Sequence, residues 1–317
     1  MRSGPAAGYR GHFHEAGFYG SDEEFVALVT PFFTEGLDAG EPVVSIFEPC
    51  RQALLRDVFG PDDGVRFIDG GEHYSKPATV VGRHREMLAE YVREGAAQIR
   101  IAGDVPHPGV GVPWDWWARY EAIANHAYDD FPMYGLCPYD SRTSPAHVVD
   151  EVLRTHPHVA TATGHRASGR YEEPADFVRD RASAWQDPLE HTPARFAFTD
   201  PAPVAVRAAI EAAGHGTEVS PADLDGLALA ATEAVTNAMI HGAAPVDVRL
   251  WAAERRMVVT VTDRGRGPQD PLVGLRPTGA TLGGLGLWIA HQVCAHVALE
   301  FAGAAFTVRL VAGEPVP

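Results

Sequence analysis

Glu233, Asn237 and His241 are spaced four residues apart in a segment whose pattern predicts one long helix. Ser220 ahead of this segment is a suitable N-cap, and Gly242 behind it is expected to end the helix. Residues four apart share a helix face, so the three polar side chains lie together, away from the apolar stripe. A carboxylate and an amide one turn apart suit a Mg²⁺–phosphate site, because hard oxygen ligands hold Mg²⁺ and a carboxylate can take up a proton.

Two glycine-containing segments follow this helix. Residues 258–262 are rich in β-branched side chains, typical of a strand, and lead into an Asp-x-Gly-x-Gly turn at residues 263–267. Residues 279–287 form a glycine-rich stretch ahead of another helix, where backbone amides can approach phosphate. A lone Glu-x-x-x-Asn pattern is more often a solvated helix face. Three such segments in this order favour a nucleotide site.

These three segments resemble the N, G1 and G2 boxes of the Bergerat ATP-binding fold, which histidine kinases and DNA gyrase share. The run Glu-Ala-Val-Thr-Asn-Ala-x-x-His-Gly, residues 233–242, looks most like the anti-sigma-factor serine kinases of Gram-positive bacteria. The resemblance covers about residues 192–312 and implies an α/β sandwich. We expect a mixed sheet there, with helices packed on one face.

The resemblance implies a role for each matching residue. Asp263 would accept a hydrogen bond from the adenine amino group, Asn237 would ligate Mg²⁺, and Glu233 would act as the base during γ-phosphoryl transfer. His241 would either contact phosphate or cap the helix, and both interpretations stay open. The remaining matches are glycines that let the backbone approach the base or the phosphates: Gly265, Gly267, Gly283, Gly284 and Gly286.

Two features of this half lie outside the motif matches. Residues 265–283 are interrupted by three prolines and several glycines, so we expect this loop to cover the nucleotide as a lid. Ala305 stands where members of the family often carry Ser or Thr near the adenine. This departure would weaken contacts to the base without abolishing them.

Residues 12–158 show a different pattern, in which short apolar strands alternate with helices. The length of 317 residues favours two domains, at about 150 residues each. Strands separated by helical stretches predict a doubly wound, mostly parallel sheet. Ligands of such sheets bind at the carboxyl ends of strands. Those ends carry Glu48-Pro49, Asp69-Gly70, Gly103-Asp104 and Tyr139-Asp140.

A nucleotide-hydrolysing α/β domain would carry Gly-x-x-x-x-Gly-Lys-[Ser/Thr] after its first strand. Residues 17–22 occupy that position and contain no lysine, and the single lysine of the chain is Lys76. We therefore expect no nucleotide hydrolysis by the N-terminal domain.

The N-terminal half resembles the MEDS sensory domain, named for methanogen and methylotroph regulators and thought to be a degenerate relative of RecA/KaiC-like ATPases. The resemblance spans residues 9–160 and implies a signal-input module, with a small-molecule signal as its partner. The matching residues are His14, Phe18-Tyr19, Asp22, Glu48-Pro49, Trp117, Tyr120-Glu121, Leu136-Cys137, Tyr139-Asp140 and Thr155-His156-Pro157.

Two side-chain groups in this half are open to a ligand-binding interpretation. His12 and His14 alternate on one strand face and could ligate a metal, but no third ligand lies at a recognisable spacing. Trp114, Trp116 and Trp117 could line a pocket, although packing within a helix is their commoner fate.

Residues 161–191 are rich in Thr, Gly, Arg, Glu and Pro, which predicts a connector with one short helix near Asp176–Trp185. A histidine kinase would need a dimerisation hairpin of about sixty helical residues, and about thirty are available. His165 and His191 lack the helical surroundings of a phosphoacceptor. The expected domains are therefore residues 9–160 and 192–317, joined by residues 161–191.

Composition disfavours several functional classes. No run of about 18 apolar residues predicts a membrane span, and no apolar signal-peptide region follows Met1. The three cysteines, Cys50, Cys137 and Cys294, are scattered, which favours free thiols in a reducing cytoplasm. The net charge of −16 lies mainly in residues 1–191 and disfavours direct binding to nucleic acid.

The sequence leaves three functional hypotheses. The leading one is a cytoplasmic anti-sigma regulator that uses ATP and Mg²⁺. It would bind a sigma factor in one state and phosphorylate an anti-anti-sigma (STAS-type) protein on Ser or Thr in another, under control of the sensory domain. The second is a binding module without kinase activity, in which ATP sets conformation. The third is a histidine kinase-like protein acting in trans. The family resemblance further implies a homodimer.

Overall fold

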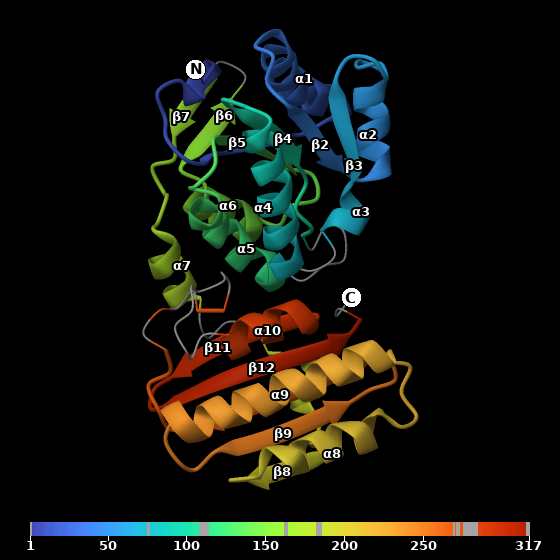
Figure 1. Ribbon diagram of the computed structural model, residues 1–317, viewed down its shortest axis with the longest axis vertical. Helices are drawn as coiled ribbons and strands as arrows, with labels where there is room; N and C mark the ends of the chain where they lie inside the picture. Colours follow the sequence, from blue (N-terminus) through green and yellow to red (C-terminus); the bar gives the residue numbers. More distant parts are fainter. Residues whose placement is uncertain are drawn as a thin grey trace. The chain divides into compact units, whose positions relative to one another are not determined.

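The chain divides into two units, Met1–Phe177 and Val178–Pro317 (Figure 1). The computed structural model describes residues 2–74, 77–107, 114–161, 164–181, 186–268, 270, 273–274 and 285–314. Each unit has its own sheet and its own hydrophobic core. In the described part of the chain, no helix combines the length and apolarity that a membrane crossing requires.

The first unit is built on a seven-stranded sheet in the order β3-β2-β4-β5-β1-β6-β7. Neighbouring strands from β3 through β6 run parallel, and β7 runs antiparallel to β6. The prediction of a mostly parallel sheet is therefore confirmed. The strands are β1 (Phe13–Tyr19), β2 (Val43–Phe47), β3 (Val65–Asp69), β4 (Ile99–Gly103), β5 (Met133–Asp140), β6 (His158–Thr161) and β7 (Gly164–Ala167).

Helices cover both faces of this sheet, as expected for a sheet of mostly parallel strands. On β1, His14 faces the side of Asn125, while the next residue, Glu15, lines a cavity with Leu28 and Phe32. Successive strand residues point to opposite faces. The helix that carries Asn125 and the helix that carries Leu28 and Phe32 therefore lie on opposite sides of the sheet. The helices are α1 (Asp22–Asp38), α2 (Pro49–Arg56), α3 (Gly70–His73), α4 (Pro77–Arg93), α5 (Trp114–Ala127) and α6 (Ala146–Thr155).

The second unit contains a five-stranded sheet in the order β11-β12-β10-β9-β8, in which all neighbouring strands run antiparallel. The expectation of a mixed sheet is therefore wrong. Short turns join β9 to β10 and β11 to β12, and a tight turn can join only antiparallel neighbours. The strands are β8 (Phe196–Thr199), β9 (Asp247–Ala252), β10 (Arg256–Asp263), β11 (His296–Ala302) and β12 (Ala305–Gly313).

Helix α9 (Pro221–His241) lies between α8 (Pro203–Gly214) and α10 (Leu285–Val293) over this sheet (Figure 1). Its predicted ends are confirmed. The Oγ atom of Ser220 accepts a hydrogen bond from a first-turn amide, and Gly242 follows the last helical residue. Small buried residues along α9, mostly alanines, let the neighbouring helices approach closely and fix which face of α9 remains polar.

The predicted connector is divided between the two units. Its first part forms β7, which extends the first sheet, and α7 (Pro174–Asp180). Its last part forms a 3₁₀ helix, η3 (Pro188–His191), which packs on the second sheet near β9. Helix α7 begins two residues before the predicted start, and residues 182–185 lie outside the described part of the chain.

A buried charge network fastens η3 to the second sheet. Arg309 on β12 is 2% exposed, and its guanidinium donates hydrogen bonds to the carboxylates of Glu190 and Glu300. Arg256 on β10 pairs with Asp187 at 3.1 Å. Trp251 adds a hydrogen bond from its indole nitrogen to the carbonyl of residue 192, so this sheet face is closed by the end of the connector.

We expect Arg309→Met to lower the free energy of unfolding of the second unit by about 3 kcal/mol, because two carboxylates would be left without their buried partner. The exposed pair Arg255–Glu314 provides a matched control. Arg255→Met should change stability by less than about 1 kcal/mol. Urea denaturation followed by circular dichroism measures both, and equal effects of the two variants would contradict this assignment.

Candidate functional site

Three of the predicted site residues meet where α10 begins. Glu233 and Asn237 are half-buried on α9, and Gly286 is the second residue of α10. A Cβ atom at position 286 would lie 2.7 Å from Oε2 of Glu233 and 3.2 Å from Nδ2 of Asn237. The glycine therefore lets the α10 backbone pass directly against the two polar side chains.

The polar groups at this junction are available to a ligand. In the described residues, neither the carboxylate of Glu233 nor the amide of Asn237 makes a hydrogen bond or ion pair with the protein. The first amides of α10 have no acceptor within their own helix, which makes a helix N-terminus favourable for phosphate. A carboxylate, an amide oxygen and a helix N-terminus suit a magnesium-bound phosphate chain.

Asp263 lies at the end of β10 and is 4% exposed. Its Oδ1 atom accepts hydrogen bonds from the amides of Gly265, at 2.6 Å, and Ala243, at 3.3 Å. Its Oδ2 atom accepts none from the described residues. The carboxylate is thus held by one oxygen and keeps the other for an external donor.

The turn after α9 contributes to this arrangement, which the sequence analysis missed. A Cβ atom at position 242 would lie 2.5 Å from Oδ1 of Asp263, and the amide of Arg264 donates to the carbonyl of Ala243 at 2.8 Å. Gly242 had been assigned only the role of ending the helix. Its lack of a side chain also makes room for the carboxylate.

Gly267 occupies a position that only glycine fits. Its φ angle is +66°, and a Cβ atom there would lie 2.5 Å from the ring of Phe306 and 2.7 Å from that of Phe301. The two rings pack with their centroids 5.0 Å apart. The backbone of the Asp-x-Gly-x-Gly turn therefore runs against an aromatic pair of β11 and β12.

Ala305 and the next hydroxyl along β12, that of Thr307, lie on the same face of the strand. Thr307 lies across from Thr262, and their Oγ1 atoms are 2.8 Å apart. Asp263 lies across from Phe306, and successive residues of a strand point to opposite faces. Ala305 and Thr307, two residues apart on β12, therefore both point away from the face that carries Asp263.

Other predicted residues are placed less closely or lie outside the description. His241 is exposed at the end of α9 and makes no hydrogen bond with the described residues. Gly283 and Gly284 lie outside the described part of the chain. Of the expected lid, residues 273–274 rest on α10, since a Cβ atom at position 274 would lie 2.8 Å from Cβ of Leu287.

The strand ends of the first unit form an ion-pair network. Asp140 accepts hydrogen bonds from Arg51 and Arg142, and the hydrogen bonds from Arg142 are the main cause of its lowered pKa. Burial raises the pKa of Asp104 to about 7. Asp69 caps α3 by accepting from the amide of Glu72. These contacts give Asp69 and Asp140 structural partners.

Comparisons with known proteins identify both units. Residues 13–157 match the MEDS family, described as the MEthanogen/methylotroph, DcmR Sensory domain. Residues 198–311 match the family of the histidine kinase-like ATPase domain. No curated protein matches the chain.

Two solved structures are similar to part of the chain. One is the crystal structure of the RsbU and RsbW domains of Rv1364c from Mycobacterium tuberculosis, at 20% identity and a TM-score of 0.28, covering 39% of this chain and 34% of that one. The other is the histidine kinase domain of the blue-light activated histidine kinase EL346 from Erythrobacter litoralis, at 20% identity and a TM-score of 0.25, covering 45% and 70%. The chain thus spans about a third of the Mycobacterium structure.

We expect Asp263→Asn to weaken binding of Mg·ATP to the full chain by about 10- to 100-fold, because a charged acceptor for the adenine amino group is lost. Asp247→Asn is the matched control, since the partners of the Asp247 side chain on β9 among the described residues are Thr199 and Arg264. Isothermal titration calorimetry measures both affinities. An unchanged affinity in a folded Asp263→Asn protein would remove Asp263 from the site.

Proposed function

Because the chain joins a MEDS sensory domain to a histidine kinase-like ATPase domain, we propose that it is an ATP-dependent protein kinase of the anti-sigma type. Its phosphoacceptor would be a serine or threonine of an anti-anti-sigma (STAS-type) protein. In its other state it would hold a sigma factor. The sensory unit would set the balance between these two states in the cytoplasm.

The convergence of Glu233, Asn237 and Gly286 is the observation that carries this proposal. The amide oxygen of Asn237 would hold Mg²⁺, which supplies charge neutralisation between the phosphates when bound. The amides at the start of α10 would hold phosphate oxygens. Asp263, at the end of β10, would accept from the adenine amino group and so orient the nucleotide.

Glu233 supports phosphoryl transfer to a hydroxyl group. Its Oε2 atom faces the start of α10, where the terminal phosphate would lie, and no cation of the described residues pairs with it. A carboxylate in this position can accept the proton of an incoming serine or threonine hydroxyl. The hydroxyl proton would pass to Glu233 as the serine or threonine oxygen bonds the γ-phosphorus of ATP, the bond from that phosphorus to the bridging oxygen breaks, and ADP leaves.

The connector supports a protein substrate over autophosphorylation on histidine. Between β6 and β8, the described residues 164–181 and 186–195 contain β7, α7 and η3. The seven residues of α7 are far shorter than the paired helices of a dimerisation hairpin. His165 lies on β7, where it pairs with Glu15, and His191 ends η3.

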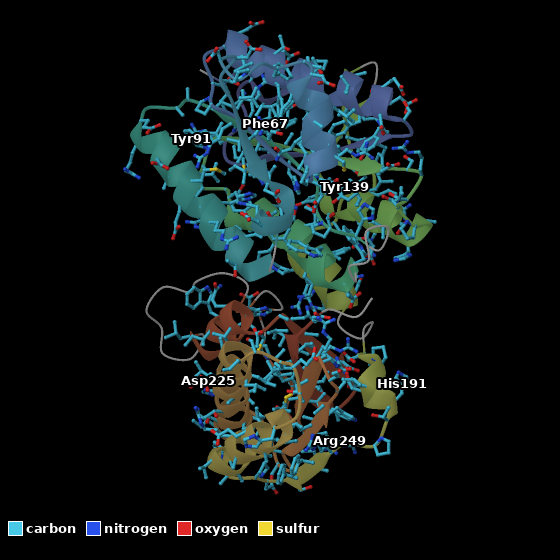
Figure 2. The ribbon with its side chains drawn as sticks, turned by 90° about the vertical axis from the view of Figure 1, so that its right-hand side faces the viewer. Phe67, Tyr91, Tyr139, His191, Asp225 and Arg249 are labelled. Carbon is cyan, nitrogen blue, oxygen red and sulfur yellow. The ribbon has the colours of Figure 1, made fainter. Side chains whose placement is uncertain are left out.

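The decisive variant is Glu233→Gln, which keeps the size of the side chain and removes the base. We expect near-normal ATP binding, retained binding of the sigma-factor partner, and transfer to the anti-anti-sigma partner slowed by about 10²- to 10⁴-fold. Asp225→Asn, two turns earlier on α9 and exposed (Figure 2), should transfer normally. Radiolabelled ATP and co-purified partners provide the assay.

Three outcomes of this assay would contradict the proposal. Equal transfer by the wild type and Glu233→Gln would remove Glu233 from the mechanism. Firm ATP binding without transfer to any co-purified partner would favour a regulatory module in which ATP only sets conformation. Transfer to a histidine of a partner would instead identify a histidine kinase acting in trans.

A further inference from the structure

Four potential metal ligands converge inside the first unit, away from the nucleotide site. They are His14 on β1, Glu121 on α5, Cys137 on β5 and His156 just after α6. One ligand atom from each lies within 4.8 Å of all the others. His14, Glu121 and His156 are at most 2% exposed, so the group is deeply buried.

The hydrogen bonds of His156 determine which of its nitrogens is free. Its Nδ1 atom lies 2.8 Å from the carbonyl oxygen of Val152, which can only accept a hydrogen bond. Nδ1 therefore carries a proton. In the neutral ring the Nε2 atom is left with a lone pair, and Nε2 has no hydrogen-bond partner although it is buried.

His14 is fixed in the same way through Asn125. The Nδ2 atom of Asn125 donates to backbone carbonyls, the shortest bond being 2.7 Å to Thr155. This orients its Oδ1 atom toward Nδ1 of His14, at 3.0 Å. Because the amide oxygen only accepts, the proton of His14 is on Nδ1, and its Nε2 atom points toward the cluster.

Glu121 adds a carboxylate to this group, which also holds the Cys137 thiol, 3.5 Å from Nε2 of His14. Its Oε1 atom accepts a hydrogen bond from Tyr139 at 2.8 Å. Its Oε2 atom has no hydrogen-bond partner and lies 3.4 Å from Nε2 of both His14 and His156. Buried lone pairs that face one another are unfavourable unless a cation lies between them.

We propose that His14, Glu121, Cys137 and His156 bind one divalent transition-metal ion, Zn²⁺ in the first place. Tetrahedral zinc with its usual bond lengths separates neighbouring ligand atoms by about 3.3 to 3.6 Å. The two N···O distances of 3.4 Å and the Sγ···Nε2 distance of 3.5 Å between Cys137 and His14 match this spacing.

The ligand set selects the class of metal. Two imidazoles and a thiolate favour zinc and its neighbours over Mg²⁺ or Ca²⁺, which prefer oxygen ligands. Four protein ligands leave no open position, as in closed structural or sensory sites. The cavity beside Glu121 and Cys137 measures only about 20 Å³, room for about one water molecule.

Metal binding would tie together parts of the sensory unit that are distant in sequence. In the sheet, His14 pairs with Gly135, so Cys137 lies two residues further along the neighbouring strand on the same face. Glu121 and His156 come from the helical layer above that face. The ion therefore links two central strands to α5 and to the end of α6, and its loss would loosen the unit.

The test uses the full chain, stripped of metal with a chelator and titrated with Co²⁺ as a spectroscopic probe. We expect one Co²⁺ per chain, with a thiolate charge-transfer band and visible bands of tetrahedral intensity, both removed by Zn²⁺. Cys137→Ser should abolish the charge-transfer band and weaken binding by at least about 100-fold. Cys50→Ser, which changes an exposed cysteine of the same unit, should leave the spectrum unchanged.

A comparison of the metal-free proteins tests whether the substitution itself changes the fold. Metal-free wild type and Cys137→Ser should have the same circular dichroism spectrum, and only the wild type should gain thermal stability with Zn²⁺. Glu121→Gln provides a second variant that keeps the thiolate band but binds Co²⁺ more weakly. A folded wild type that binds no stoichiometric Co²⁺, or an unchanged spectrum in Cys137→Ser, would overturn the proposal. The proposal would also be overturned if the variants changed only the pH dependence of unfolding. The four side chains would then share a proton in place of a metal ion.

Discussion

The contact between Gly286 and the polar face of α9 is the constraint on which the proposed nucleotide site depends. A side chain at this position would occupy the space of the Glu233 carboxylate and would hold α10 away from Asn237. With glycine, the start of α10 lies against both groups, so the first amides of this helix lie near a carboxylate and an amide side chain. The alanine-rich stripe of α9 supports this geometry from the other side, because it lets α8 and α10 pack closely.

Local chemistry in the sequence was sufficient to predict the elements that carry the site. Ser220 and Gly242 mark the two ends of α9, and the four-residue spacing of the polar residues within it identifies one helix face. Both signals can be read from the sequence because caps and helical periodicity are properties of neighbouring residues. The Asp-x-Gly-x-Gly turn was recognised for the same reason. The structure adds that Gly242 and Ala243 hold Asp263 through space, a relation between two turns that spacing cannot express.

Relations between distant residues could not be predicted in this way. The second sheet is antiparallel where a mixed sheet was expected, because strand direction depends on how the chain returns across the helices. His12 and His14 were considered as a metal pair and lacked a third ligand. The structure brings three further candidate ligands close to His14, at positions 121, 137 and 156. None of the three lies at a sequence spacing that a metal-binding motif would show. His12 instead stacks on His14 and bonds the carbonyl of Ala124.

We propose that the chain has one nucleotide site, formed by α9, the turn after β10 and the start of α10. The most direct measurement is the stoichiometry of Mg·ATP binding to the full chain by equilibrium titration. We expect one nucleotide per chain, since residues 17–22 of the first unit lack the lysine of a phosphate-binding loop. A folded chain that binds no nucleotide, or one that binds two, would contradict it.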